Sequence, residues 1–341
     1  MTERGPLDDV RARVMQQAQG AMALNLAFIG VANRLFDALA SAASVAEIAA
    51  RTGLDAGYLL RWCEAAYAFG YLDAEAERYV VTDLGRAFTS TAPASLIPFA
   101  VGSVLGAHMA ERAAGLMKTG ERPGESVLAE RATILPWFGP MLEASFGAMF
   151  EREILPGVAA YRELDARGGV AVDLGCGNGW YLRALARNFP HVRGIGLDGF
   201  EENIRQAGER AAAEGLGERL SFRAGDIYGY SEGEPVDLVA MNRALHHVWD
   251  QKEKVMHILH DALRPGGSVV IWEPSWPASL EALREPRRRG MAYQNLSEHV
   301  QGNHFLRPDE IESALREVGF VTRTQVFAEG TEAVVTGLKR E

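Results

Sequence analysis

The residues with the clearest chemical potential form a glycine-rich turn in the second half of the 341-residue chain. Residues 170–181 read Val-Ala-Val-Asp-Leu-Gly-Cys-Gly-Asn-Gly-Trp-Tyr, so an apolar run ends in Asp173 before Gly175, Gly177 and Gly179. A strand, a tight glycine turn and a helix start let the backbone approach a ligand closely and present unpaired amides to it. The spacing is not the Gly-x-Gly-x-x-Gly of dinucleotide binders. The turn therefore predicts a binding site for another polar ligand.

Two further groups follow at the ends of apolar runs. Asp198 comes about twenty residues after the turn, at the place of a ribose-binding acid on a second strand. A carboxylate there can accept hydrogen bonds from two ribose hydroxyls. His246 and His247 come after a later apolar run. A histidine titrates near neutral pH, so this pair is a candidate for general base catalysis.

The segments that carry these residues alternate between strand and helix patterns, which favours a doubly wound α/β sheet. One strand is expected to lead into the glycine turn and a second to end at Asp198. A helix is expected later, over 309–318. The further strands are expected at 220–224, 236–242, 267–273, 320–327 and 333–338.

This order of landmarks resembles the class I S-adenosylmethionine-dependent methyltransferases over residues 150–341. The resemblance implies an α/β fold with a Rossmann-like doubly wound sheet and an antiparallel last strand, in a catalytic domain over 161–341. It also implies S-adenosyl-L-methionine as cofactor, with the glycine turn at its methionine part and Asp198 at its ribose. The other contacts implied are Asp226 at the adenine amino group, Ile227 at the ring, and Asp173 and Asn242 in the same site.

The first 92 residues read as helix, turn, helix and β-wing, the pattern of a winged helix. Ser44 begins a capping box, Asp55 caps the helix expected at 58–69, and a strand is expected at 78–82. Residues 1–90 hold eight Arg and no Lys against eleven Asp and Glu, which disfavours DNA binding. The pattern resembles the dimerisation domain of small-molecule methyltransferases, so we expect a homodimer and no nucleic-acid partner.

Residues 93–160 are expected to bridge the two domains and to roof a substrate pocket. Phe146 and His108 are candidate substrate contacts there, although interdomain packing explains either residue equally well. Trp249 and His299 are further candidates, and the loop 118–125 is expected to be solvated.

Catalysis is expected at the segment 242–250, which resembles the Leu-His-Asp-Trp segment of O-methyltransferases. By that resemblance His246 is the general base for a small-molecule hydroxyl, typically of a natural product. An extra residue before Trp249 departs from the family pattern and leaves His247 as an alternative base. A second alternative is a metal-dependent C-methyltransferase of 2-oxo acids with His246 and His299 as ligands. A third is a regulator that senses S-adenosylmethionine and binds DNA through the winged helix.

Composition restricts the class of protein. The formal net charge is −10, and 48% of residues are hydrophobic against 23% charged, as in globular proteins. Two cysteines, Cys63 and Cys176, make no disulfide framework. We expect a cytoplasmic protein with no membrane span, because no signal-peptide pattern or long apolar run stands out.

Overall fold

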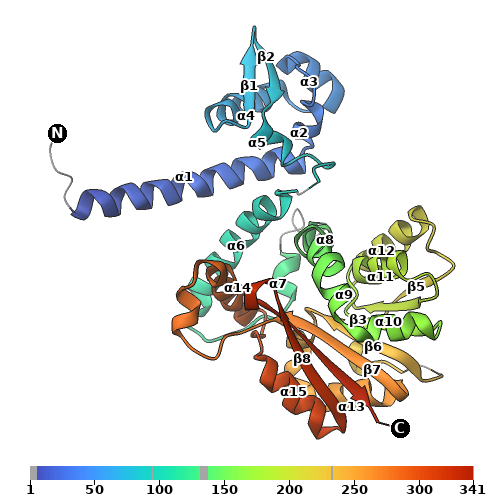
Figure 1. The fold of residues 1–341 in the computed structure, drawn as a ribbon. Coiled ribbons are helices and arrows are strands. Elements are labelled where there is room, and N and C mark those ends of the chain that lie inside the picture. Colours follow the sequence, from blue (N-terminus) through green and yellow to red (C-terminus); the bar gives the residue numbers. More distant parts are fainter. Residues whose placement is uncertain (1–5, 94, 131–136, 232, 341) are drawn as a thin grey trace. The chain divides into compact units, whose positions relative to one another are not determined.

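The computed structural model describes residues 6–93, 95–130, 137–231 and 233–340. The chain divides into two compact units, residues 1–109 and 110–341 (Figure 1). The division falls inside the segment 93–160 that the sequence analysis treats as a bridge. Within the described part of the chain, none of the helices combines the length and apolar character that a bilayer crossing requires.

The N-terminal unit contains the expected winged helix. Ser44 accepts a hydrogen bond from the Glu47 amide and the Glu47 carboxylate accepts one from the Ser44 amide, so the predicted capping box is confirmed. Asp55 caps the second helix by accepting from the Tyr58 amide. The wing is an antiparallel pair of strands, β1 (Leu72–Glu75) and β2 (Arg78–Val81). The helices are α1 (Pro6–Ala32), α2 (Leu35–Ala38), α3 (Val45–Thr52), α4 (Ala56–Ala68), α5 (Asp83–Arg86) and α6 (Ile97–Leu116), whose end belongs to the second unit.

The C-terminal unit is built on a seven-stranded sheet in the order β5-β4-β3-β6-β7-β9-β8 (Figure 1). The strands β3 to β7 are parallel, β9 runs antiparallel to β7, and β8 pairs antiparallel with β9. This confirms the doubly wound sheet and its antiparallel end. The strands are β3 (Val170–Leu174), β4 (Arg193–Asp198), β5 (Leu220–Ala224), β6 (Val236–Asn242), β7 (Leu263–Pro274), β8 (Phe320–Phe327) and β9 (Glu332–Lys339).

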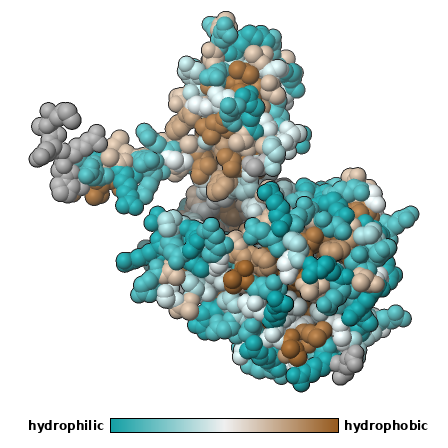
Figure 2. All heavy atoms as spheres, in the orientation of Figure 1, coloured by the Kyte–Doolittle hydropathy of each residue, from teal (hydrophilic) through white to brown (hydrophobic). Residues whose placement is uncertain are grey.

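Helices cover both faces of this sheet, because consecutive strand residues point to opposite sides. Ala171 packs on one face with residues of α10 and α11, whereas Val172 packs on the other face with α13 and α15. The helices are α7 (Ser126–Ala129), α8 (Phe138–Met149), α9 (Leu155–Gly157), α10 (Ala159–Ala166), α11 (Trp180–Asn188), α12 (Glu201–Ala213), α13 (Lys252–Ala262), α14 (Arg289–Val300) and α15 (Pro308–Glu317). On the side of this unit seen in Figure 2, the surface is mostly hydrophilic with separate hydrophobic patches.

The strand order reverses between β3 and β6, which are neighbours although two strands separate them in sequence. The helices that follow these two strands lie on opposite faces, and in doubly wound sheets ligands bind beyond the carboxyl ends of strands at such a reversal. Asp173 lies near the end of β3 and Asn242 ends β6. The fold therefore brings the predicted cofactor and catalytic residues to one edge of the sheet.

Candidate active site

The glycine turn connects β3 to α11 through backbone conformations that favour glycine. Gly175, Gly177 and Gly179 have φ angles of 80°, 53° and 74°. Side chains would also collide at two of these positions. A Cβ at Gly175 would lie 2.7 Å from the Ala244 side chain, and one at Gly179 would lie 2.6 Å from Phe222. The turn is thus held close to its neighbours while the space around a Cβ at Gly177 is open.

Asp198 ends β4 and fixes the turn. Its Oδ2 atom accepts from the Gly177 amide at 2.8 Å. Its Oδ1 atom accepts from the Phe200 amide and from Asn203 Nδ2, each at 3.0 Å. Because each carboxylate oxygen has two lone pairs, Oδ2 retains one for a ligand hydroxyl, while Oδ1 must exchange a partner to bind a second.

Asp173 and Asn242 meet across β3 and β6, where Asn242 Nδ2 donates to Asp173 Oδ1 at 2.9 Å. Burial raises the pKa of Asp173 to about 7, the hydrogen bond from Asn242 opposes this, and the charge of Asp198 adds to it. Asn242 Oδ1 is buried with no hydrogen-bond partner in the structure. The edge of the sheet therefore presents two acceptors to a cationic or N–H ligand group.

Asp226 and Ile227 follow β5, where the sequence predicts the adenine contacts. The Asp226 carboxylate caps a short 3₁₀ turn by accepting from the Tyr228 amide at 2.9 Å. Asp226 is exposed and Ile227 is half-buried. Both lie on the loop after a parallel strand, at the same edge of the sheet as Asp198.

The centre of the candidate active site is a buried histidine–carboxylate pair. His246 lies on the 3₁₀ segment Leu245–Gln251 after β6, and Glu273 lies near the end of the adjacent β7. His246 Nδ1 is 2.7 Å from Glu273 Oε2, and Glu273 Oε1 accepts from the Leu245 amide at 2.8 Å. Burial raises the pKa of Glu273, but His246, Arg243 and His247 outweigh it and hold that pKa below its usual value. The ionised carboxylate accepts Nδ1–H and leaves the lone pair of His246 on Nε2.

His247 has a similar pairing on its neighbouring ring. Its Nδ1 atom is 2.8 Å from Glu125 Oε1, and the Asn303 amide lies 2.8 Å from the same nitrogen. Burial lowers the pKa of His247, but the hydrogen bond to Glu125 and the charges of Glu298 and Glu273 hold it above its usual value. Glu125 ends the loop 118–125, so this end of the loop contacts the site instead of being fully solvated.

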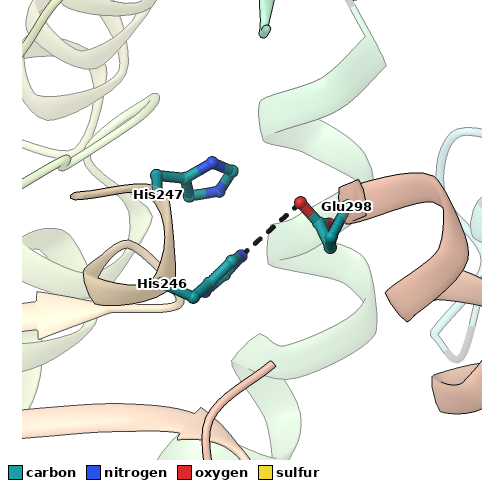
Figure 3. Close-up of side chains that lie close together, drawn as sticks. All are labelled: His246, His247 and Glu298. Carbon is teal, nitrogen blue, oxygen red and sulfur yellow. Dashed lines mark ion pairs between the residues drawn. The ribbon is translucent and has the colours of Figure 1, made fainter. Parts of the chain in front are cut away.

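Glu298 of α14 faces the two histidines (Figure 3). Its Oε2 atom lies 3.7 Å from His246 Nε2, and it is buried with 6% of its surface exposed. Among the described residues, His246, His247 and Glu298 form a group whose ligand atoms all lie within 4.8 Å of one another. His299, the second metal ligand expected from the sequence, is exposed and lies outside this group.

The remaining predicted substrate contacts differ in burial and in their neighbours. Phe146 is half-buried, its ring 5.8 Å from that of Trp272 and 4.0 Å from the Arg243 guanidinium. Trp249 is half-buried with Lys252 Nζ 5.1 Å from its ring. His108 is buried and belongs to the N-terminal unit. Substrate contacts at all four positions, including His299, stay predictions.

Sequence reasoning assigned no role to the three carboxylates around the histidines. Glu273 carried a usable signal, since an acidic residue at the end of a fully buried strand needs a partner. Glu298 and Glu125 lie in a helix and a loop without any comparable signal. Their contacts with the histidines depend on tertiary structure.

Comparisons with known proteins identify the family. Residues 171–267 match the methyltransferase domain family. The O-methyltransferase SfmM3 of Streptomyces lavendulae is 32% identical over 240 residues, which cover 67% of this chain and 68% of that protein. The chain belongs to the S-adenosylmethionine-dependent methyltransferases.

Two solved methyltransferases share the fold along nearly the whole chain. An O-methyltransferase family protein from Burkholderia thailandensis has a TM-score of 0.74 at 18% identity, covering 99% of each chain. Human N-acetylserotonin methyltransferase, solved in complex with S-adenosylmethionine, has a TM-score of 0.73 at 18% identity, covering 99% of this chain and 100% of that one. In two other curated relatives the match spans only about a third of the relative's length, 32% and 38%.

S-adenosylmethionine is the cofactor of this methyltransferase family, and the residues at the sheet edge fit it. The unpartnered Asn242 Oδ1 and the Asp173 carboxylate suit the ammonium group of the methionine part. The open space at Gly177 allows close backbone approach, and Asp198 Oδ2 retains a lone pair for a ribose hydroxyl. These residues would hold the cofactor along the carboxyl ends of β3 and β4.

Proposed function

We propose that this chain methylates a hydroxyl group of a small molecule, with His246 and Glu273 as the catalytic pair. The observation that supports this most is the buried contact of 2.7 Å between His246 Nδ1 and Glu273 Oε2. The pair lies beyond the ends of β6 and β7, next to Asn242 and Asp173 at the cofactor edge. An acceptor bound there would have the base on one side and the methyl donor on the other.

The cofactor supplies a methyl group that is already activated on a sulfonium. The protein therefore has to exclude water, align the acceptor oxygen and remove its proton. Glu273 fixes the His246 ring through two contacts, one to Nδ1 and one to the Leu245 amide. His246 Nε2 then takes the proton of the acceptor hydroxyl, and Glu273 stabilises the imidazolium that forms.

Two other functions considered from the sequence have less support. Metal-dependent carbon methylation with His246 and His299 as ligands loses a ligand, because His299 is exposed. A DNA-binding regulator would need cations on the second helix of the winged helix. That helix is α4, and its Arg61 is already paired with Glu64 at 2.6 Å.

We further propose a homodimer that forms through α1. Large apolar side chains are exposed along this helix, and three of them, Met15, Met22 and Ile29, repeat every seventh residue. A repeat of seven presents one apolar stripe to a partner helix. The exposed apolar residues of α1 are Leu7, Val10, Val14, Met15, Met22 and Ile29.

The test of the proposed activity is transfer of labelled methyl from S-adenosylmethionine to a panel of phenols and other hydroxyl compounds. Once an acceptor is found, His246→Ala should lower turnover roughly a hundredfold or more while cofactor affinity by calorimetry stays unchanged. His257→Ala, an exposed histidine of α13, is the matched control and should keep full turnover. Normal turnover of His246→Ala would remove the base role from His246.

A further inference from the structure

We propose that His246, His247 and Glu298 bind one divalent transition-metal ion, which would coordinate an oxygen of the methyl acceptor. This inference rests on the proposed methyltransferase function, because it assigns the ion to the same acceptor site. The three side chains come from two segments far apart in sequence, the 3₁₀ segment after β6 and α14 (Figure 3). Their ligand atoms all lie within 4.8 Å of one another, so one ion can reach all three after small side-chain movements.

Both histidines are paired as metal-bound histidines usually are, with one ring nitrogen next to a carboxylate. His246 Nδ1 is 2.7 Å from Glu273 Oε2, and His247 Nδ1 is 2.8 Å from Glu125 Oε1. An ionised carboxylate only accepts hydrogen bonds, so the pairing with Glu273 places the hydrogen of His246 on Nδ1. At His247, Nδ1 lies next to both an acceptor, Glu125 Oε1, and a donor, Asn303 Nδ2, so these contacts allow the hydrogen on either ring nitrogen. The ligand atom left on His246 is Nε2, which faces Glu298 Oε2 at 3.7 Å.

The charges around the group also call for a cation. Glu273 and Glu298 are buried, and Glu125 is 41% exposed at its side chain. The Glu298 carboxylate accepts hydrogen bonds from two neutral amides, Gln301 Nε2 at 3.2 Å and Gln294 Nε2 at 3.5 Å. Three carboxylates face the two histidines, and a divalent ion held by their imidazoles would balance negative charge of these carboxylates.

Two imidazoles and one carboxylate suit a first-row transition ion better than Mg²⁺ or Ca²⁺. Three protein ligands leave at least one coordination position for an oxygen of the acceptor. The ion would make a bound hydroxyl more acidic, so that it releases its proton to solvent. The oxygen would then form the new C–O bond to the methyl group as the C–S bond of the sulfonium breaks and the demethylated cofactor leaves. The ion and the proton of the acceptor would compete for the Nε2 lone pair of His246, so His246 would act as the general base only in the metal-free protein.

The test uses the full chain without a histidine tag, treated with chelator and titrated with Co²⁺ alone. We expect one Co²⁺ per chain, with Glu298→Gln and His247→Ala each weakening binding at least about tenfold. His299→Ala is the matched control, because it removes an exposed histidine next to Glu298 and should leave the affinity unchanged. No stoichiometric binding, equal binding in all variants, or loss of binding in His299→Ala would overturn the proposal.

Two further measurements keep the result decisive. If a variant does not fold, the visible spectrum of the cobalt-loaded wild type replaces it. Bands of a four- or five-coordinate nitrogen and oxygen site support the proposal, and the spectrum of hydrated cobalt overturns it.

Calorimetry with S-adenosylmethionine on the same preparations separates the metal-site proposal from the proposed methyltransferase function. Cofactor binding without Co²⁺ binding would refute only the metal site, whereas loss of cofactor binding by the folded wild type would count against the proposed function.

Discussion

Glu273 contacts His246 twice, through the ring nitrogen Nδ1 at 2.7 Å and through the backbone amide at 3.3 Å. One carboxylate at the end of β7 therefore fixes both the backbone turn and the ring that follow β6. This explains how a histidine on a short 3₁₀ segment acquires a single orientation. The catalytic role proposed for His246 depends on that orientation.

Replacing Glu273 with glutamine should lower turnover by roughly a hundredfold. The neutral amide binds the Nδ1–H of His246 less strongly than the carboxylate does, and it stabilises the imidazolium less. Oε1 still accepts from the Leu245 amide, so the fold and the cofactor affinity should remain. The measurement is single-turnover methyl transfer with an identified acceptor. In the double variant with His246→Ala, little further loss is expected, since the two residues act as a unit. Independent, additive losses would contradict the pair.

Asp198→Ala should weaken S-adenosylmethionine binding more than tenfold, because the variant loses the ribose contact that we expect of Asp198 and the hydrogen bond from the Gly177 amide. Asp198→Asn should have a smaller effect, since it keeps one carbonyl oxygen. Isothermal titration calorimetry measures both. Glu218→Ala, at an exposed acidic residue, serves as the control. An unchanged dissociation constant in Asp198→Ala would place the ribose elsewhere.

Stability should depend on pH through Asp173. Its pKa in the fold is about 7 against an ordinary 3.8, so the native protein holds a proton that the unfolded chain has released between these values. The free energy of unfolding should therefore fall as pH rises from about 4 to about 7. Asp173→Asn mimics the neutral side chain and should gain stability over the wild type at pH 8 but not near pH 4. Urea unfolding of the cofactor-free protein at both pH values measures this, and an equal difference at both would refute it.

The dimer proposal predicts an effect of charge on α1. Met22 is 59% exposed, so Met22→Glu should leave the protomer folded but shift the mass in multi-angle light scattering from dimer to monomer. Met117→Glu is the matched control, because Met117 is 75% exposed outside α1 and should leave the dimer intact. A monomeric wild type, or a dimeric Met22→Glu variant, would argue against assembly through this helix.

Local sequence patterns were sufficient to predict much of the fold. The strands at 220–224, 236–242 and 320–327 have the predicted bounds, and the capping box at Ser44 forms as expected. These features depend on short-range chemistry, since apolar runs form buried strands and a Ser-x-x-Glu spacing satisfies helix amides locally. The glycine turn could be recognised for the same reason, because its positive φ angles need glycine whatever surrounds it.

The surroundings of the histidines were decided by tertiary structure. Glu125, Glu273 and Glu298 are separated from His246 by 27 residues or more. Only the pairing of β6 with β7 and the packing of α14 bring them together. The sequence alone therefore identified His246 and His247 as candidate bases and offered His299 as a second metal ligand in one alternative, but it gave no role to the three carboxylates. Which side chains can share a ligand depends on their distances in space. A contact between a loop, a strand end and a distant helix therefore cannot be predicted from spacing along the chain.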